Sequence, residues 1–152
     1  MVIEQIENSN EKEQIARRIL EDLPDWFGLE QSRETYIRES KDQSFFAAVE
    51  GAEILGFLCL KETGRDTLEL SVMGVLKEYH HRGIGRKLFE TARNFAKEKG
   101  YSFLQVKTVQ MGRYREYDAT NAFYLSLGFK ELEVFPTLWD PWNPCQIYVM
   151  AL

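Results

Sequence analysis

The sequence predicts an α/β (α+β) protein with a mixed central β-sheet of six to seven strands and about four flanking helices. Three strand patterns are joined by short turns, an amphipathic helix follows the third strand, and another strand comes directly after that helix. Short turns favour antiparallel neighbours, whereas a strand, helix and strand in this order form a right-handed crossover between parallel strands. With 152 residues, the chain is expected to form a single domain over residues 1–152.

The N-terminal region is expected to contain one strand and two helices. Residues 1–7 alternate apolar and polar positions, which is typical of a strand. Ser9 or Asn10 is expected to cap the first helix, which Pro24 ends. A second helix with a narrow apolar face is expected over residues 29–39.

Two apolar runs then predict a hairpin at the centre of the sheet. Residues 44–49 and 53–62 have strand length and are separated by a short turn containing Gly51. Their nearly continuous hydrophobicity indicates strands that are covered on both faces.

The segment at residues 68–100 contains the most informative pattern. Apolar and polar residues alternate from Leu68 to Met73, as expected of a strand, and Gly74 then interrupts the pattern, which indicates a bulge or a splayed strand end. In the second half of the segment, apolar residues recur at helical spacing with charged residues on the opposite side. An amphipathic helix is therefore expected to begin at Gly83 and Gly85.

The two glycines predict an anion-binding site at the start of this helix. Without side chains there, an anionic group can approach the unpaired backbone N–H groups and the positive end of the helix dipole. Arg82, Arg86 and Lys87 add positive charge, which suits a pyrophosphate better than a single carboxylate. The alternative is that the glycines only form a tight turn beside a solvated basic face.

The C-terminal third is expected to contribute three more strands and one helix. Strands are predicted at residues 103–109, 130–135 and 146–151, and residues 110–119 are predicted to form a loop that leads into a helix around Tyr124. Residues 136–145 contain three prolines, from which we expect irregular structure. The two tryptophans of this insertion either cover a small apolar acceptor or cap the end of the sheet.

Composition and charge exclude several classes of protein. The net charge of -5 argues against nucleic-acid binding, which needs a basic surface, and it tolerates an amine-bearing partner. No signal peptide or membrane-spanning run is present, so a cytoplasmic protein is expected. Cys59 and Cys145 form neither a metal motif nor a disulfide framework, and no metal is expected.

The glycine turn resembles the acetyl-CoA-binding motif of the GCN5-related N-acetyltransferase (GNAT) superfamily. That motif reads Gln or Arg, two residues, Gly, one residue, and Gly or Ala; residues 80–85 (HHRGIG) have its spacing, with His80 at the Gln or Arg position. The resemblance implies acetyl-CoA as cosubstrate, and a strand that splays so that its free backbone groups hold the pantetheine arm. The implied cofactor-binding residues are Met73, Gly74, Val75, His81, Arg82, Gly83, Ile84, Gly85 and Arg86.

Residues 121–129 (NAFYLSLGF) resemble the later motif of the same family, a short helix with a tyrosine and then a glycine-aromatic turn. In many members this tyrosine, here Tyr124, donates a proton to the departing thiolate of coenzyme A. Without the resemblance, Tyr124 would be interpreted as an aromatic residue at the edge of the core. Many members carry Asn seven residues earlier, where this chain has Tyr117, and Asn121 is out of register.

The resemblance implies an N-acetyltransferase that acts by direct attack of a primary amine on acetyl-CoA. Tyr124 is then the acid, a backbone N–H near Val75 holds the oxyanion, and Glu69 is the candidate base; the alternative for Glu69 is a solvent-facing strand residue. His80 and His81 lie at the phosphate end, too far from the amine to act as bases.

The aromatic residues favour a small, partly apolar amine as acceptor over an extended protein tail, while peptide N-termini, polyamines, aminoglycosides and amino acids all stay open. Many relatives pair as homodimers, so a homodimer is an open prediction. Two other functions are an acyl-CoA-binding regulatory protein without turnover and a nucleotide-binding module that uses the same turn. Six aromatic or basic side chains are candidates for the acceptor pocket, although Trp26 and Phe27 could instead pin two helices together. These candidates are Trp26, Phe27, Tyr36, Arg113, Tyr114 and Tyr117.

Overall fold

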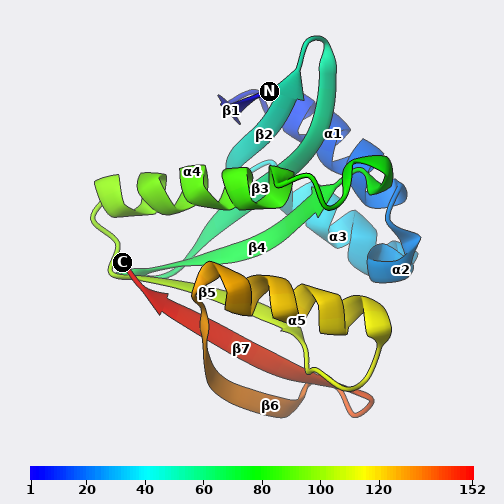
Figure 1. Ribbon diagram of the computed structural model, residues 1–152, viewed down its shortest axis with the longest axis vertical. Helices are drawn as coiled ribbons and strands as arrows, with labels where there is room; N and C mark the ends of the chain where they lie inside the picture. Colours follow the sequence, from blue (N-terminus) through cyan, green and yellow to red (C-terminus); the bar gives the residue numbers. More distant parts are fainter.

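The computed structural model describes residues 1–152 and contains one seven-stranded sheet with helices on both faces (Figure 1). The strands are β1 (Val2–Ile6), β2 (Ser44–Glu50), β3 (Glu53–Gly64), β4 (Thr67–Val75), β5 (Phe103–Val109), β6 (Lys130–Asp140) and β7 (Asn143–Ala151). The helices are α1 (Ser9–Glu21), α2 (Pro24–Phe27), α3 (Glu30–Ser40), α4 (Ile84–Glu98) and α5 (Arg115–Leu127), with a 3₁₀ turn at Lys77–Tyr79.

The strand order is β1-β2-β3-β4-β5-β7-β6, and every neighbouring pair is antiparallel except β4 and β5. The predicted mixed sheet and the parallel crossover through α4 are therefore confirmed. The helices number one more than the four expected, because Pro24 begins the one-turn helix α2 at the point where α1 was expected to end. None of the helices is long and apolar enough to cross a membrane.

The sheet separates two hydrophobic cores. Helix α4 and the C-terminal part of α5 pack on one face against Leu68, Leu104 and Tyr148, while α1 and α3 pack on the other face against Phe45 and Phe57. Figure 1 shows this arrangement, with α4 and α5 in front of the sheet and α1 and α3 behind it. The N-cap of α1 is Asn8, whose side chain accepts the N–H of Glu11, so the prediction of a cap at Ser9 or Asn10 was wrong by one or two residues.

Strands β4 and β5 separate soon after they begin. Their parallel pairing covers only Thr67 to Glu69 on β4, whereas β4 stays paired with β3 as far as Val75. The predicted splay is confirmed, but the bulge lies at Ser71 rather than at Gly74, because Cys59 pairs with Val72 and the next residue of β3 pairs with Leu70. The extra residue turns Leu70 toward the α4 core and Val72 toward the α1 core.

The C-terminal insertion forms a hairpin of two strands, so the prediction of irregular structure at residues 136–145 was wrong about the strands, although the β6–β7 pairing is interrupted between Phe135 and Asp140. Strand β6 continues through Pro136 to Asp140, and Pro141 lies in the short turn before β7. Pro136 is tolerated because β6 is the edge strand and its pairing with β7 is interrupted between Phe135 and Asp140, so its missing N–H breaks no ladder bond.

Helix α5 begins at Arg115, which shortens the predicted loop at residues 110–119. The side chain of Asp118 accepts the N–H of Gly112 at 2.7 Å and so fastens the loop to the first turn of the helix. Acidic residues in that turn, Glu116 and Asp118, also suit the positive end of the helix dipole. No apolar period marks this point, because residues 111–115 are exposed and none of residues 116–120 is fully buried.

Candidate active site

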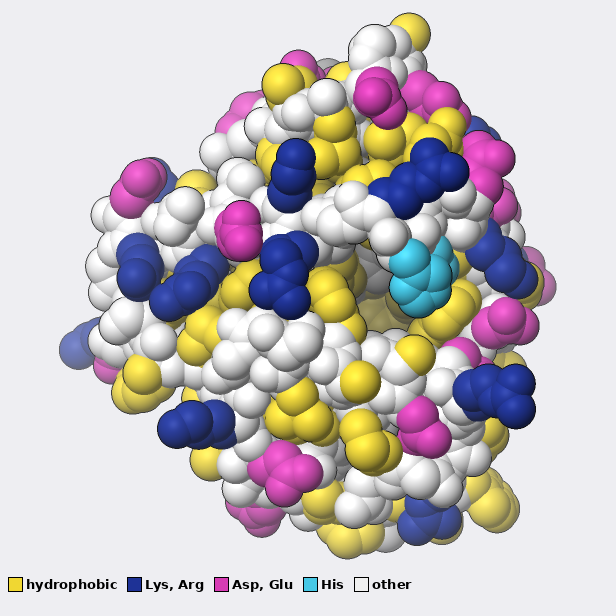
Figure 2. Space-filling view, viewed as in Figure 1, with side chains coloured by type: hydrophobic (Ala, Val, Ile, Leu, Met, Phe, Trp, Pro, Cys, Tyr) yellow, Lys and Arg dark blue, Asp and Glu magenta, His cyan; other side chains and the backbone are white.

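A cavity of about 1200 Å³ opens where β4 and β5 separate. Its walls come from β4, β5, all of the helices except α1, and the β6–β7 hairpin. In the view of Figure 2, which matches Figure 1, a hollow lies between α4 and α5, with histidine side chains at its rim and Lys and Arg side chains gathered above it. Segments far apart in the sequence therefore meet around a single space.

The end of β4 offers main-chain groups to this cavity. The N–H of Leu76 donates to Leu55 O at 2.9 Å, which makes these two residues a hydrogen-bonded pair of the β3–β4 ladder. Because hydrogen-bonded and non-bonded pairs alternate along an antiparallel ladder, the N–H and C=O groups of Val75 and Met73 point away from β3. They face the gap that β5 leaves, and Gly74 faces β3.

Gly74 has a packing role. A side-chain carbon at this position would lie 2.9 Å from Ile19 Cγ2 and 3.0 Å from Leu23 Cδ1. The absence of a side chain lets α1 pack directly on β4, and so it brings α2, which follows α1, to the edge of the cavity.

His80 holds the carbonyl group of Val75. Its Nε2 lies 2.7 Å from Val75 O, so this nitrogen is the protonated donor, and the N–H of Val75 is left available to the cavity. The imidazole also makes an edge contact with the indole of Trp26, with ring centroids 5.8 Å apart. A side chain of the glycine turn thereby positions the end of the splayed strand, and the expectation that His80 lies only at the phosphate end was wrong.

The start of α4 is open to an anion. Gly83 is the N-cap residue, with φ of 79°, and no side chain caps the helix. The first turn contains no acidic residue, and a side-chain carbon at Gly83 would meet no atom within 4 Å. The first N–H groups of the helix therefore combine free donors with the positive end of its dipole.

Two arginines flank this turn in different ways. The guanidinium of Arg82 lies over the ring of Tyr79, 5.1 Å from its centroid, and Arg82 does not line the cavity. Arg86 lines the cavity and donates to Ser126 Oγ at 3.2 Å, which links α4 to α5. Of the residues predicted around the turn, His81, Ile84 and Gly85 also line the cavity.

Gly85 lies where α4 approaches α5. A side-chain carbon at this position would be 3.2 Å from Phe123 Cζ and 3.4 Å from Met73 Cε. Glycine is therefore needed to leave a narrow passage between the two helices beside the end of β4.

Tyr124 lies at the bottom of the cavity and is 7% exposed. Burial raises the pKa of its hydroxyl, and the nearby Tyr36 and Tyr117 raise it further. Burial likewise raises the pKa of Tyr117 to about 12. Tyr124 therefore stays protonated at neutral pH and can act as a proton donor.

Asn121 connects α5 to the sheet and is fully buried. Its Nδ2 donates to Val109 O at 2.8 Å and to Tyr117 O at 2.7 Å, and its Oδ1 accepts the hydroxyl of Tyr148 at 2.5 Å. Since Tyr124 lies one turn further along the same helix, this network sets the position of Tyr124. Asn121 therefore positions the site from beneath and does not line it.

Trp26, on α2, forms hydrogen bonds with α5 on the other side of the cavity. Its Nε1 donates to Glu116 O and to Thr120 Oγ1, each at 3.2 Å, and its carbonyl oxygen accepts the hydroxyl of Tyr117 at 2.9 Å. Together with the contact to His80, these bonds join the tyrosine helix to the end of β4. Phe27, Tyr36, Tyr114 and Tyr117 line the cavity as predicted, and Arg113 does not.

Glu69 is placed differently from its predicted role as a base. It does not line the cavity, its side chain is 13% exposed, and its Oε1 lies 3.3 Å from the Nζ of Lys107. Lys107 does line the cavity, on β5, with 31% of its side chain exposed. The signal for Lys107 in the sequence is a single charge within the strand pattern of residues 103–109, and it belongs to neither family motif.

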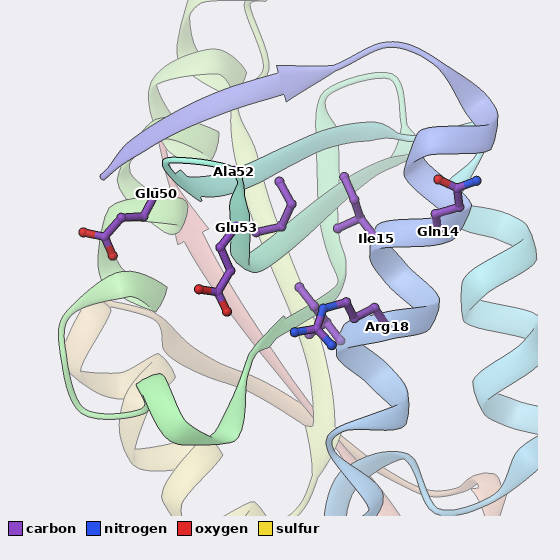
Figure 3. A pocket seen from close by; sticks show the side chains of 8 residues that line it. Gln14, Ile15, Arg18, Glu50, Ala52 and Glu53 are labelled. Carbon is purple, nitrogen blue, oxygen red and sulfur yellow. The ribbon is translucent and has the colours of Figure 1, made fainter.

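A second concavity, of about 580 Å³, lies between α1 and the β2–β3 turn and shares no residue with the first. In Figure 3, Arg18 and Glu53 extend toward its opening, and Glu50 points away from it. Its lining contains no buried acid, no nucleophile and no helix start. The cavity at the splay is therefore the candidate active site.

Comparison with known proteins agrees with this geometry. The sequence model of the family described as an acetyltransferase (GNAT) domain matches residues 41–131, more than half of the chain. The chain belongs to the GNAT family. A relative from Chlorobaculum tepidum, described as an uncharacterised N-acetyltransferase, is 29% identical over 119 residues, which cover 77% of this chain and 68% of that protein.

Solved GNAT structures have the same fold. An acetyltransferase assigned to the family, from Desulfovibrio desulfuricans, superposes with a TM-score of 0.87 at 18% identity, covering 99% of this chain and 98% of that one. An aminoglycoside 6'-N-acetyltransferase complexed with coenzyme A superposes with a TM-score of 0.74 at 17% identity, covering 99% and 97%. At these identities the likeness concerns the fold.

The cavity is described below in two parts. The GNAT match covers β4, the glycine turn, α4, β5 and α5, and it excludes α2, α3 and most of the β6–β7 hairpin. The cavity lining formed by β4, residues 80–86 and Phe123 is called the cofactor part below. The lining formed by α2, α3, β5, the first turns of α5 and the hairpin is called the acceptor part.

Proposed function

We propose that this GNAT protein transfers the acetyl group of acetyl-CoA to a primary amine of a small molecule by direct attack. One observation carries the proposal: the outward-facing N–H groups of β4 and the uncapped start of α4 line the same cavity as the buried Tyr124. Each feature alone has a purely structural explanation. Their convergence at the splay supports a site for a long anionic thioester.

The cofactor part fits acetyl-CoA. The N–H groups of Gly83, Ile84 and Gly85 would receive the pyrophosphate, with Arg86 beside them. The N–H and C=O groups of Met73 and Val75 would bond the amides of the pantetheine arm as an added strand would. The coenzyme supplies an activated acetyl group, and the chain supplies binding, orientation and a proton.

The reaction requires a neutral amine, a place for negative charge and a proton for the leaving sulfur. The amine gives up one proton to water and attacks the thioester carbonyl carbon, so that a C–N bond forms, the C–S bond breaks and the nitrogen loses a second proton. The N–H of Val75, which His80 leaves free, would hold the carbonyl oxygen as it becomes negative. Tyr124 would give its proton to the sulfur and be reprotonated by the proton that the nitrogen releases.

The similar structures support the class of acceptor. The aminoglycoside 6'-N-acetyltransferase that shares this fold acts, by its name, on a small molecule. The aromatic walls of the cavity here also suit a small molecule that can be enclosed.

Two measurements test the proposal. Isothermal calorimetry should detect binding of CoA and acetyl-CoA, and release of free thiol from acetyl-CoA should depend on an added amine from a panel of small amines. Binding without amine-dependent thiol release from any of them would favour a regulatory protein that binds acyl-CoA. Tight binding of ATP with no binding of CoA would instead favour a nucleotide-binding module.

A further inference from the structure

We propose, on the basis of the function proposed above, that the acceptor is a small amino acid with an aromatic or apolar side chain, whose carboxylate binds Lys107. Three features lead to this substrate class: the aromatic walls of the acceptor part, its single cation, and a carboxylate outside the cavity lining that contacts this cation.

The walls of the acceptor part are aromatic and apolar. Phe27 and Tyr36 come from α2 and α3, with ring centroids 5.8 Å apart in an edge contact, and Leu138 and Trp139 face the cavity from the hairpin. Leu138 and Trp139 are 53% and 44% exposed, so a ligand that covers them would remove apolar surface from water. These surfaces suit a flat or branched apolar side chain.

Lys107 is the single cation of the acceptor part. Histidine and arginine side chains that line the cavity lie in the cofactor part, at residues 80–86. Lys107 carries three N–H donors, and Glu69 Oε1, at 3.3 Å, is the acidic atom beside it. Donors therefore remain for a second carboxylate, and Lys107 is only partly exposed, so an ion pair formed there is less screened than one on the surface.

None of the acidic residues that line the acceptor part forms an ion pair with Lys107. The carboxylate of Asp140 is directed into its own hairpin, where it accepts the N–H groups of Trp142 and Asn143 at 2.9 and 2.8 Å. Asp25 lies 3.7 Å from Lys77 Nζ at the surface. Glu116, in the first turn of α5, suits the positively charged amine of an arriving acceptor.

Glu69 acts on the acceptor through Lys107 and is a positioning residue. It belongs to the last residue pair before the splay, opposite Gln105 on β5, and its carboxylate reaches Lys107 two residues further along β5. A partly buried carboxylate held there fixes the position of the ammonium, which lines the gap between the strands. A single molecule with an amine and a carboxylate on one carbon can then bind Lys107 and place its nitrogen near the end of β4.

The test compares three amines with the same ring: L-phenylalanine, L-phenylalaninamide and 2-phenylethylamine. With the full-length protein and acetyl-CoA, kcat/KM from thiol release should be about tenfold or more higher for phenylalanine than for the other two, as expected for one charged hydrogen bond. Lys107→Gln should lower kcat/KM for phenylalanine by that factor and change the other two much less. Lys61→Gln is the matched control, because Lys61 lies opposite Glu69 on β3 and is exposed outside the cavity.

Equal use of 2-phenylethylamine and phenylalanine, or an equal loss for all three amines in Lys107→Gln, would overturn the proposal. If no amine releases thiol, the transferase function fails, and calorimetry of the CoA-loaded protein with the same three amines then decides the acceptor class alone. The proposed acceptor class would be supported if phenylalanine binds the wild type and Lys61→Gln but does not bind Lys107→Gln. Absence of phenylalanine binding to the wild type would refute it.

Discussion

The Nε2 of His80 lies 2.7 Å from the carbonyl oxygen of Val75, so a side chain of the glycine turn holds the last residue of the splayed strand. The imidazole is also braced by Trp26, which is bonded to α5 on the other side of the cavity. The distance between the end of β4 and the helix that carries Tyr124 therefore depends on contacts that cross the cavity. The GNAT motif usually has Gln or Arg at the position of His80, and the structure gives histidine a definite task there.

Replacing His80 tests this contact. His80→Ala removes the donor to Val75 O, and we expect kcat to fall about tenfold, because the N–H of Val75 is no longer held in place. His80→Gln retains a donor of similar reach and should recover most of the loss. Steady-state kinetics with an accepted amine measures both, and calorimetry should show CoA affinity within a few-fold of wild type. A kcat for the Gln variant as low as that of the Ala variant would contradict the positioning role.

Replacing Gly83 tests the anion site at the start of α4. Gly83→Asp places a carboxylate beside the first N–H groups, and we expect CoA affinity to fall about a hundredfold or more because of charge repulsion. Gly83→Asn is the matched control, since Asn has the same shape without the charge and tolerates the positive φ of 79° at this position. Calorimetry with CoA compares them; an equal loss in both variants would mean that shape, and not phosphate binding, explains the glycine.

Replacing Tyr124 tests the proton donor. Tyr124→Phe removes the hydroxyl and leaves the ring in the core, so we expect kcat to fall about a hundredfold with little change in CoA affinity. Tyr117→Phe is the comparison, because the hydroxyl of Tyr117 is already engaged with Trp26 O. Turnover by Tyr124→Phe at the wild-type rate would remove the proposed role.

Replacing Asn121 tests the network beneath the site. Asn121→Ala leaves the carbonyl groups of Val109 and Tyr117 and the hydroxyl of Tyr148 without their buried partner. We expect the free energy of unfolding to fall by about 2 to 3 kcal/mol, measured by urea denaturation. Ser126→Ala, at an exposed position on the same helix, should change it much less. A loss in Asn121→Ala no larger than that control would show that α5 is held by packing alone.

The sequence alone predicted the elements whose signal is local. The period of the apolar residues in α4, the glycines at its start and the alternation along β4 all come from neighbouring residues, so the strand, turn and helix were identified within a few residues. The prediction for the proline-rich insertion at residues 136–145 was wrong about the strands, because β6 and β7 extend through it. The position of β6 at the sheet edge, where its pairing with β7 is interrupted between Phe135 and Asp140, removes the cost of a missing N–H.

The residues of the candidate site also fall into two groups, those that the sequence predicted and those that only the tertiary structure brings together. The glycine turn and Tyr124 were found from short motifs, because backbone N–H groups at a helix start and a tyrosine before a glycine turn are sequential features. The partnership of Glu69 with Lys107 joins strands that are separated by the whole of α4, and the contacts of Trp26 join residues about 90 positions apart. Only the pairing of the strands and the packing of α2 on α5 bring these side chains together, and no periodicity encodes which of them meet. The sequence thus determined the fold and the chemistry expected at the cofactor end, whereas the tertiary structure decided the shape and charge of the acceptor end, since these depend on long-range contacts.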